Sequence, residues 1–365
     1  MKILFDHQYF STQKYGGITR YFAALNKGLN NLPGISGQIG ALYSENAYLP
    51  KGLLPLDNVI GRKIFNRHNN RLFRWNKRYS NYLIKQDNYD VFHPTYYDTY
   101  FLDIIKRPFV ITVHDMIHET LPALFPDSAA VIARKKQLIE KANALIAISE
   151  YTKQEIIRYY PHAVAKITVV HHGYILNPVS ASALVLPEKY ILFVGDRAHY
   201  KNFTTFIKSI NGLLQQDKSL HLICAGGGLF SKQEQEIISG FNIAAQCQQL
   251  TVTDAQLKQL YTQATVFAFP SYKEGFGLPL LEAFANYCPV VCSNASCFPE
   301  IAGDAALYFD PMDEASVKKT VAQVLNDDDT RKLLIAKGRQ RLQRFTFDNC
   351  VDNTIQVYKT LLKSV

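Results

Sequence analysis

The chain is poor in cysteine, and its cysteines are not arranged for cross-linking or for metal binding. Six cysteines occur in 365 residues, none before Cys224, and no two of them form a CxxC pair. A disulfide framework or a structural zinc site requires closer, repeated spacing. We therefore exclude both and expect free thiols in a reducing cytoplasm.

Long apolar runs, polar tracts and low-complexity segments are also missing. No apolar stretch reaches the length of a membrane-spanning helix, about 20 residues. Asp6 interrupts the apolar start too early for a secretion signal. We therefore expect neither a membrane-spanning helix nor export. With 47% apolar residues the chain can bury a large core, and its length suggests two domains of about 180 residues.

Acidic residues are scarce in the first half of the chain. Residues 1–180 carry 22 Lys and Arg against 13 Asp and Glu, whereas residues 181–365 carry 18 of each. From residue 62 to residue 85 there are eight basic residues, many aromatic ones and no acid. The two halves are therefore expected to meet different partners.

Short apolar runs alternate with amphipathic segments, as in βαβ units with parallel sheets. The runs predicted as strands cover residues 2–5, 109–113, 144–148, 166–170, 190–195, 221–225, 265–269, 289–292 and 306–309. Residues 175–187 contain two prolines and no charge, and they are predicted to be a linker. We predict an α/β protein of two Rossmann-like domains, residues 1–174 and 188–345, that face each other across a cleft. A final helix over 346–365 can pack back toward the first domain.

The most informative segment is FPSYKEGFGLPLLEA, residues 269–283, which follows a predicted strand and opens a helix. Gly275 and Gly277 allow the backbone to approach a ligand closely, and Pro279 suits the first helical position. The amides and dipole of a helix start favour an anion such as a phosphate. Glu274 precedes the helix and Glu282 lies one turn into it. The alternative is a tight turn followed by an ordinary solvated glutamate.

This segment resembles the signature of the retaining glycosyltransferases of family 4, which have the GT-B fold. The family's hallmark is two glutamates separated by seven residues, here Glu274 and Glu282. Further landmarks match along nearly the whole chain; they lie at residues 16–17, 113–115, 148–153, 170–173 and 193–195. The N-terminal matches are looser than the C-terminal one, as expected of a domain that varies with the acceptor.

The resemblance implies roles for the residues around this signature. Glu282 should bind the ribose of a nucleotide, while Glu274 should hold the donor sugar together with nearby amides. Those amides are the ones of Gly275, Phe276, Gly277 and Leu278, and they should also hold a phosphate oxygen.

The resemblance also implies that Arg197 and Lys201, followed by Asn202, neutralise the donor's diphosphate. Fixed cations stabilise charge that develops on such a leaving group. Many relatives have Arg-Lys-Asn where this chain has Tyr200-Lys201-Asn202, so Arg197 would supply the missing guanidinium. A surface salt bridge is the alternative for Arg197.

Two features of the first half complete the implied site. His114 should lie near the donor sugar; the alternative is a histidine satisfied by backbone groups at a strand end. Gly16 and Gly17 should bring amides to the diphosphate or the acceptor, with a simple turn as the alternative. Asp115, His118 and Glu119 are expected to support the loop.

No metal site or cofactor is expected. His171-His172 has no partner at ligand spacing. The triplet Gly226–Gly228 is not a GxGxxG fingerprint and is expected to shape a loop over the nucleotide.

The basic stretch, residues 62–85, admits two interpretations. A basic, aromatic amphipathic helix can attach to an anionic membrane surface or bind acceptor phosphates. Alternatively, its aromatic face (Phe65, Leu72, Trp75, Tyr79 and Tyr82) is core and its charges are solvated. Nucleic-acid binding is the lesser hypothesis, because no nucleic-acid-binding module is recognisable.

The resemblance therefore implies a metal-independent, retaining hexosyltransferase. It would transfer a hexose, with mannose from GDP-mannose favoured over a UDP-hexose, to a saccharide or lipid-linked saccharide in polysaccharide or lipopolysaccharide synthesis. It would act in the cytoplasm, or on the inner face of the cytoplasmic membrane. The alternatives are a GT-B sugar epimerase or phosphorylase and a catalytically silent saccharide- or nucleic-acid-binding protein.

Overall fold

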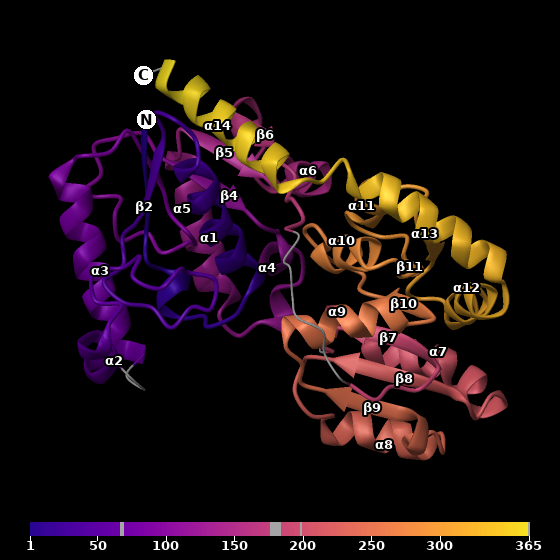
Figure 1. Ribbon diagram of the computed structural model, residues 1–365. Coiled ribbons are helices and arrows are strands. Elements are labelled where there is room, and N and C mark those ends of the chain that lie inside the picture. The colour runs from indigo at the N-terminus through magenta and orange to yellow at the C-terminus, as the bar shows by residue number, and fades with distance from the viewer. Residues whose placement is uncertain (66–68, 176–183, 198, 364–365) are drawn as a thin grey trace. The chain divides into compact units, whose positions relative to one another are not determined.

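The computed structural model describes residues 1–65, 69–175, 184–197 and 199–363 (Figure 1). Two compact units are present: Met1–His172 together with Phe347–Val365, and Gly173–Thr346. We call them unit 1 and unit 2. Most of the predicted linker, residues 175–187, lies outside the described residues. No helix in the described ranges is long and apolar enough to cross a membrane.

Unit 1 is built on parallel strands in the orders β2-β1-β3 and β4-β5-β6. A parallel bridge between Phe92 and Phe109 connects β3 to β4. The strands are β1 (Lys2–Phe5), β2 (Ser36–Ile39), β3 (Val91–His93), β4 (Val110–Val113), β5 (Ala144–Ala147) and β6 (Ile167–Val169). The helices are α1 (Gly17–Asn30), α2 (Val59–Phe65), α3 (Asn69–Gln86), α4 (Ile117–Thr120), α5 (Ser128–Lys141), α6 (Glu150–Tyr159) and α14 (Phe347–Lys363). Strand β4 is buried along its whole length, as its aliphatic sequence predicts, whereas the edge strand β6 is partly exposed.

The C-terminal helix α14 belongs to unit 1 and runs beside β5 (Figure 1). Its buried face includes Val351, Ile355, Tyr358 and Leu361; Leu362, which the sequence placed on the same face, is 37% exposed. The Tyr358 hydroxyl lies 2.7 Å from Nδ1 of the fully buried His93. The helix is therefore anchored by apolar packing and by a polar contact inside the core.

The buried face of α3 differs from the predicted one. Leu72, Asn76, Ser80 and Ile84 are buried at helical spacing, whereas Trp75 is 44% exposed and Tyr82 is 56% exposed. Asn76 and Ser80 are buried because they hydrogen-bond to the strand-end backbone: the Asn76 side chain contacts Leu42 and Tyr43, and the Ser80 hydroxyl donates to Gly40 O. The prediction that the aromatic residues of this helix are core could not detect buried polar residues of this kind. The aromatic residues Trp75 and Tyr82 therefore belong to the solvent face.

Unit 2 contains one parallel six-stranded sheet in the order β12-β11-β10-β7-β8-β9. The strands are β7 (Lys189–Val194), β8 (Leu220–Ala225), β9 (Cys247–Leu250), β10 (Val266–Phe269), β11 (Val290–Ser293) and β12 (Leu307–Phe309). The helices are α7 (Phe203–Gln216), α8 (Lys232–Gly240), α9 (Asp254–Gln263), α10 (Leu278–Ala285), α11 (Phe298–Ala302), α12 (Glu314–Asn326) and α13 (Asp328–Leu342). The strand order reverses between β7 and β10, so the loops that follow these two strands flank a topological switch point.

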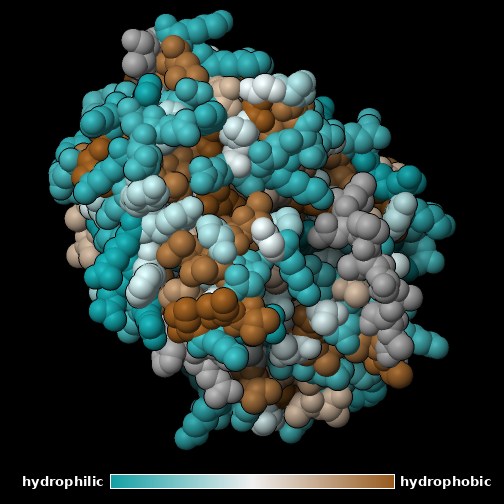
Figure 2. Space-filling model, turned by 60° about the vertical axis from the view of Figure 1, so that its left-hand side comes forward, coloured by the Kyte–Doolittle hydropathy of each residue, from teal (hydrophilic) through white to brown (hydrophobic). Residues whose placement is uncertain are grey.

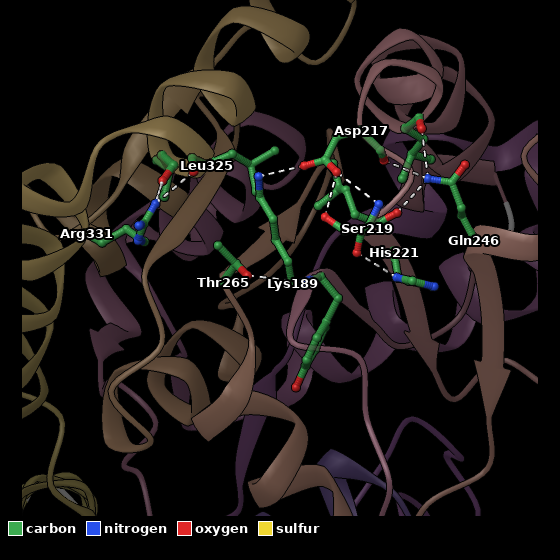
Figure 3. Close-up of polar contacts among 12 residues, drawn as sticks. Lys189, Asp217, Ser219, His221, Gln246, Thr265, Leu325 and Arg331 are labelled. Atoms are coloured by element: carbon green, nitrogen blue, oxygen red, sulfur yellow. Dashed lines mark hydrogen bonds and ion pairs between the residues drawn. The ribbon is translucent and has the colours of Figure 1, made fainter.

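At the other end of these strands, the amino ends of β7 and β8, side chains hydrogen-bond to one another and to the backbone (Figure 3). Lys189 Nζ lies 2.8 Å from an oxygen of Asp217, and this contact holds the pKa of the Asp217 carboxyl below its ordinary value. The side-chain amide of Gln246 donates to three carbonyls, those of Leu214, Asp217 and Leu220. Ligand chemistry is therefore expected at the carboxyl edge.

Candidate active site

The centre of the site in unit 2 is an ion pair between the two loops at the switch point. Lys201, after β7, places Nζ 2.6 Å from Oε1 of Glu274, after β10. The side chains are 20% and 12% exposed, so both charges are shielded but reachable. Burial lowers the pKa of Lys201, yet the Glu274 carboxylate, together with Tyr200 and Asp196, outweighs burial and the pKa is raised. Lys201 is therefore a fixed cation next to a fixed carboxylate.

Asn202 joins the same two loops. It takes the left-handed conformation (φ 60°) and caps α7, and its side-chain amide donates to Pro270 O (3.2 Å) and Pro311 O (2.7 Å). The amide of Tyr272 also donates to Tyr200 O, at 3.0 Å. Asn202 thus positions Lys201 against the Glu274 loop. Its side-chain amide is used in these two hydrogen bonds.

The segment from Gly275 to Leu278 forms the start of α10. Gly277 caps the helix with φ 92°, and a Cβ there would lie 3.2 Å from the Phe298 ring, so glycine is required. The helix begins at Leu278, which makes Pro279 its second residue instead of its first. Phe276 is buried with its ring edge-on to Phe345. This segment therefore offers backbone amides and a helix dipole to a ligand beside Glu274.

Glu282 lies one turn further along α10. One of its oxygens accepts a hydrogen bond from the Tyr261 hydroxyl at 3.2 Å. Burial and this carboxylate keep the pKa of Tyr261 far above its ordinary value, so the phenol stays protonated as a donor.

Ser271, which the sequence did not single out, is 1% exposed, and its Oγ has no hydrogen-bond partner among the described residues. A serine two residues after a strand at the switch point could have been noticed.

Arg197 has different contacts from those expected. Its side chain is 3% exposed, Nε lies 2.9 Å from Oε1 of Glu234, and Nη1 and Nη2 donate to backbone carbonyls of the loop after β8. This is neither a surface salt bridge nor a side chain presented to a ligand. The structure does not bring the Arg197 guanidinium to the Lys201–Glu274 pair, because the loop after β8 already engages its nitrogens.

His114 lies in unit 1 at the carboxyl end of β4. It is 6% exposed, and within the described residues its Nε2 has no hydrogen-bond partner. Burial, with His93 and Lys135 nearby, lowers the pKa of His114 to about 3, so the ring is neutral at physiological pH. Its ring stacks on that of His172 with centroids 5.8 Å apart. The sequence missed this pairing, although His172 follows β6 at the same edge of the sheet.

Contacts from α5 support the loop that carries His114. Nζ of Lys135 contacts Oε2 of Glu119 at 2.9 Å and Asp115 O at 3.0 Å, and the Lys135 and Glu119 side chains are 0% and 2% exposed. Lys135 also lies 5.1 Å from the centre of the Tyr97 ring, whose hydroxyl accepts from the His114 amide. Asp115 and Glu119 therefore support the loop, as expected.

Gly16 and Gly17 form the start of α1. Gly16 is the cap with extended backbone (φ 170°), and Gly17 is the first helical residue. The Gly16 carbonyl accepts from the Thr19 hydroxyl at 3.0 Å. The two glycines thus present a helix start at the carboxyl side of β1. In the described part of the chain, no group of three or more His, Cys, Asp or Glu residues has the geometry of a metal site.

Comparison with known proteins identifies the class. The family "Glycosyltransferase Family 4" matches residues 15–177, and "Glycosyl transferases group 1" matches residues 180–341. The chain belongs to the glycosyltransferases of the GT-B fold. The family resemblance and the fold class predicted from the sequence are confirmed.

Among characterised relatives, the chain is similar to O-antigen mannosyltransferases. It is 28% identical to O-antigen chain mannosyltransferase B of Escherichia coli over 267 residues, which is 69% of this chain and 70% of that protein. It is 29% identical to O-antigen chain mannosyltransferase RfbU of Salmonella typhimurium over 253 residues, 67% of each chain.

Solved structures support the fold. Sucrose-phosphate synthase from Thermosynechococcus elongatus has a TM-score of 0.76 at 18% identity and covers 100% of this chain and 99% of its own. HepE from Anabaena, solved in complex with UDP and glucose, has a TM-score of 0.71 at 17% identity and covers 100% of both chains. At these identities the likeness shows the fold alone.

Proposed function

We propose that this glycosyltransferase moves a hexose, with mannose from GDP-mannose favoured, from a nucleotide sugar to a saccharide or lipid-linked saccharide acceptor. The anomeric configuration is retained and no metal ion takes part. The observation that carries the proposal is the Lys201–Glu274 pair beside the start of α10, at the switch point of the unit 2 sheet. The named mannosyltransferase relatives support the sugar and a role in polysaccharide synthesis.

The chemistry follows from the charges. As the bond from the anomeric carbon to the diphosphate breaks, negative charge grows on the leaving phosphate. Lys201 and the amides at the start of α10 stabilise that charge because they are fixed before the reaction. Glu274 orients the sugar hydroxyls, and Glu282 holds the ribose. The acceptor attacks from the face that the diphosphate leaves, and the departing phosphate takes the acceptor's proton.

Ligand-dependent thermal unfolding tests the donor assignment. We expect GDP and GDP-mannose to raise Tm more than UDP, ADP and their sugar conjugates do, equally with and without magnesium. A ligand at a hundred times its Kd stabilises the native state by about 2.7 kcal/mol. Glu282→Ala should abolish the shift, because it removes the expected ribose contact. Glu236→Ala, on the exposed side of α8, is the matched control and should keep it.

Each other outcome redirects the proposal. A shift with UDP alone would replace GDP as the donor base, and a strict magnesium requirement would overturn metal independence. A shift with saccharide but with no nucleotide would favour the silent binding protein. Product analysis with and without acceptor then separates transfer from epimerisation or phosphorolysis.

We further propose that the enzyme works at the anionic inner face of the cytoplasmic membrane through the exposed face of α3. That face carries four cations and two aromatic residues and no acid: Arg71, Arg74, Trp75, Arg78, Tyr82 and Lys85. Figure 2 turns forward the side of Figure 1 on which α2 and α3 lie, and it shows hydrophobic patches set among hydrophilic groups. Amphipathic aromatic rings beside cations suit a lipid headgroup region.

Vesicle sedimentation tests this surface. We expect binding to vesicles that contain phosphatidylglycerol and none to pure phosphatidylcholine. Arg71→Gln, Arg74→Gln and Arg78→Gln together should weaken binding by about 3 kcal/mol, roughly a hundredfold. The same charge loss on exposed α5 positions, Arg134, Lys136 and Lys141, is the control. Equal losses in both triple variants, or equal binding to both vesicles, would contradict the proposal.

A further inference from the structure

The loop after β8, residues 226–229, has a backbone conformation that strongly favours glycine. Gly226, Gly227 and Gly228 have φ values of 90°, 69° and 71°, three consecutive left-handed residues. A Cβ on Gly227 would lie 2.9 Å from both Arg197 Nη1 and Gly195 O. The loop is therefore pressed against Arg197 and against the loop after β7, at the carboxyl edge of the sheet.

Arg197 organises this loop through its carbonyls. Nη1 donates to Gly226 O, and Nη2 donates to Gly228 O and Leu229 O, each at 2.9 Å, with a longer contact to Gly227 O at 3.4 Å. Four successive peptides thus turn their oxygens toward one guanidinium. The cation lies beside two stacked aromatic rings, with its centre 4.9 Å from the Phe230 centroid and 5.7 Å from that of Phe203.

Glu234 fixes the guanidinium from the other side. Its Oε1 accepts from Arg197 Nε at 2.9 Å, and its Oε2 accepts from the Ser231 amide at 2.6 Å. Ser231 Oγ in turn accepts from the Glu234 amide, which completes a capping box at the start of α8. Arg197 is therefore anchored to a helix that is itself capped.

The consequence concerns the amide groups of the loop. In a trans peptide the N–H points opposite to the C=O. Since the oxygens of residues 226–229 face Arg197, the N–H groups of Gly227, Gly228, Leu229 and Phe230 face away from it. None of these four amides donates to another residue in the described part of the chain, and residues 227–229 are exposed. Consecutive outward amides form an anion-binding nest, and the cation behind them polarises each peptide toward an anion.

We propose that Arg197 is a positioning residue that holds this nest open for the diphosphate of the donor. The inference rests on the proposed function, since it assigns the nest to the same nucleotide sugar. In this proposal Arg197 does not contact the phosphate directly. It acts through the four peptides whose carbonyls it binds. Lys201 remains the cation that contacts the leaving group, and it acts independently of the loop.

Calorimetric titration with the nucleoside diphosphate selected by the thermal shifts tests this assignment. Arg197→Lys keeps the charge but cannot serve four carbonyls, and Gly227→Ala forces a Cβ into the loop. Each should weaken diphosphate binding by about tenfold or more while affinity for the free nucleoside stays unchanged. Gly240→Ala is the matched control, because nothing lies within 4 Å of a Cβ at that position.

The double variant distinguishes positioning from direct contact. If Arg197 acts through the loop, Arg197→Lys with Gly227→Ala should bind no more weakly than the weaker single variant. Losses that multiply would show a direct Arg197–phosphate contact and overturn the proposal. If Arg197→Lys fails to fold, unchanged diphosphate affinity in Gly227→Ala alone overturns it. If wild type binds no nucleoside diphosphate at all, the proposed function fails first, and that result is separate from either of these.

Discussion

Replacing Glu274 with glutamine should lower kcat by about a hundredfold and leave nucleoside diphosphate binding intact. The amide keeps the size of the carboxylate but removes the charge that lies 2.6 Å from Lys201 Nζ. Under the proposed function, that charge orients the sugar. Loss of one preorganised group that acts in the transition state costs about this much. Binding should persist because the proposed phosphate contacts, Lys201 and the start of α10, are unchanged. The measurement is release of nucleoside diphosphate from the donor in the presence of a lipid-linked saccharide extract, beside thermal-shift binding.

Lys201→Met supplies the opposite result and so tests the division of roles. It should weaken diphosphate binding, because it removes the cation and leaves Glu274 repelling the phosphates. Glu236→Gln is the matched control for Glu274→Gln; its pair with Lys232 spans 4.0 Å and is largely exposed, so neither binding nor turnover should change. Full turnover by Glu274→Gln would remove Glu274 from the reaction.

Replacing Lys135 with methionine should destabilise unit 1 by about 3–5 kcal/mol. The side chains of Lys135 and Glu119 are 0% and 2% exposed, so the variant leaves a buried carboxylate without its counter-charge. Among the described residues, Oε1 of Glu119 already has no hydrogen-bond partner, which leaves little compensation. Urea unfolding followed by the fluorescence of Trp75, the only tryptophan, reports on unit 1.

Two comparisons make this result specific. Lys136→Met, next along the chain, breaks an exposed pair with Glu140 at 3.8 Å and should cost less than about 1 kcal/mol. The double variant Lys135→Met with Glu119→Leu should recover most of the lost stability, because it removes both buried charges. A Lys135→Met variant as stable as Lys136→Met would show that Glu119 reaches solvent or becomes protonated at little cost.

The loop that Lys135 braces also carries His114, so stability and turnover should respond differently in the double variant. Lys135 contacts Asp115 O, and Tyr97, beneath the same ammonium, contacts the His114 amide. In the double variant, restored stability with turnover still reduced would indicate that the ion pair positions His114 in addition to stabilising the fold.

The sequence by itself determined the fold class and the centre of the site. All nine predicted strands occur, because buried parallel strands are recorded as short β-branched runs. The strands missed, β2, β3 and β9, read SGQI, VFH and CQQL, which are too short or too polar to stand out. Glu274 and Glu282 could be singled out because glycine, proline and glutamate at a strand-to-helix junction are local features.

Only the tertiary structure decided which face of α3 is buried and what Arg197 contacts. Asn76 and Ser80 are core residues because their partners come from the turn after β2, more than thirty positions away along the chain. Arg197 contacts Glu234 and the carbonyls of residues 226–229, which only the pairing of β7 with β8 brings beside it. Apolar burial leaves a periodic trace in the sequence, whereas the partner of a buried polar group depends on the neighbour that the fold supplies.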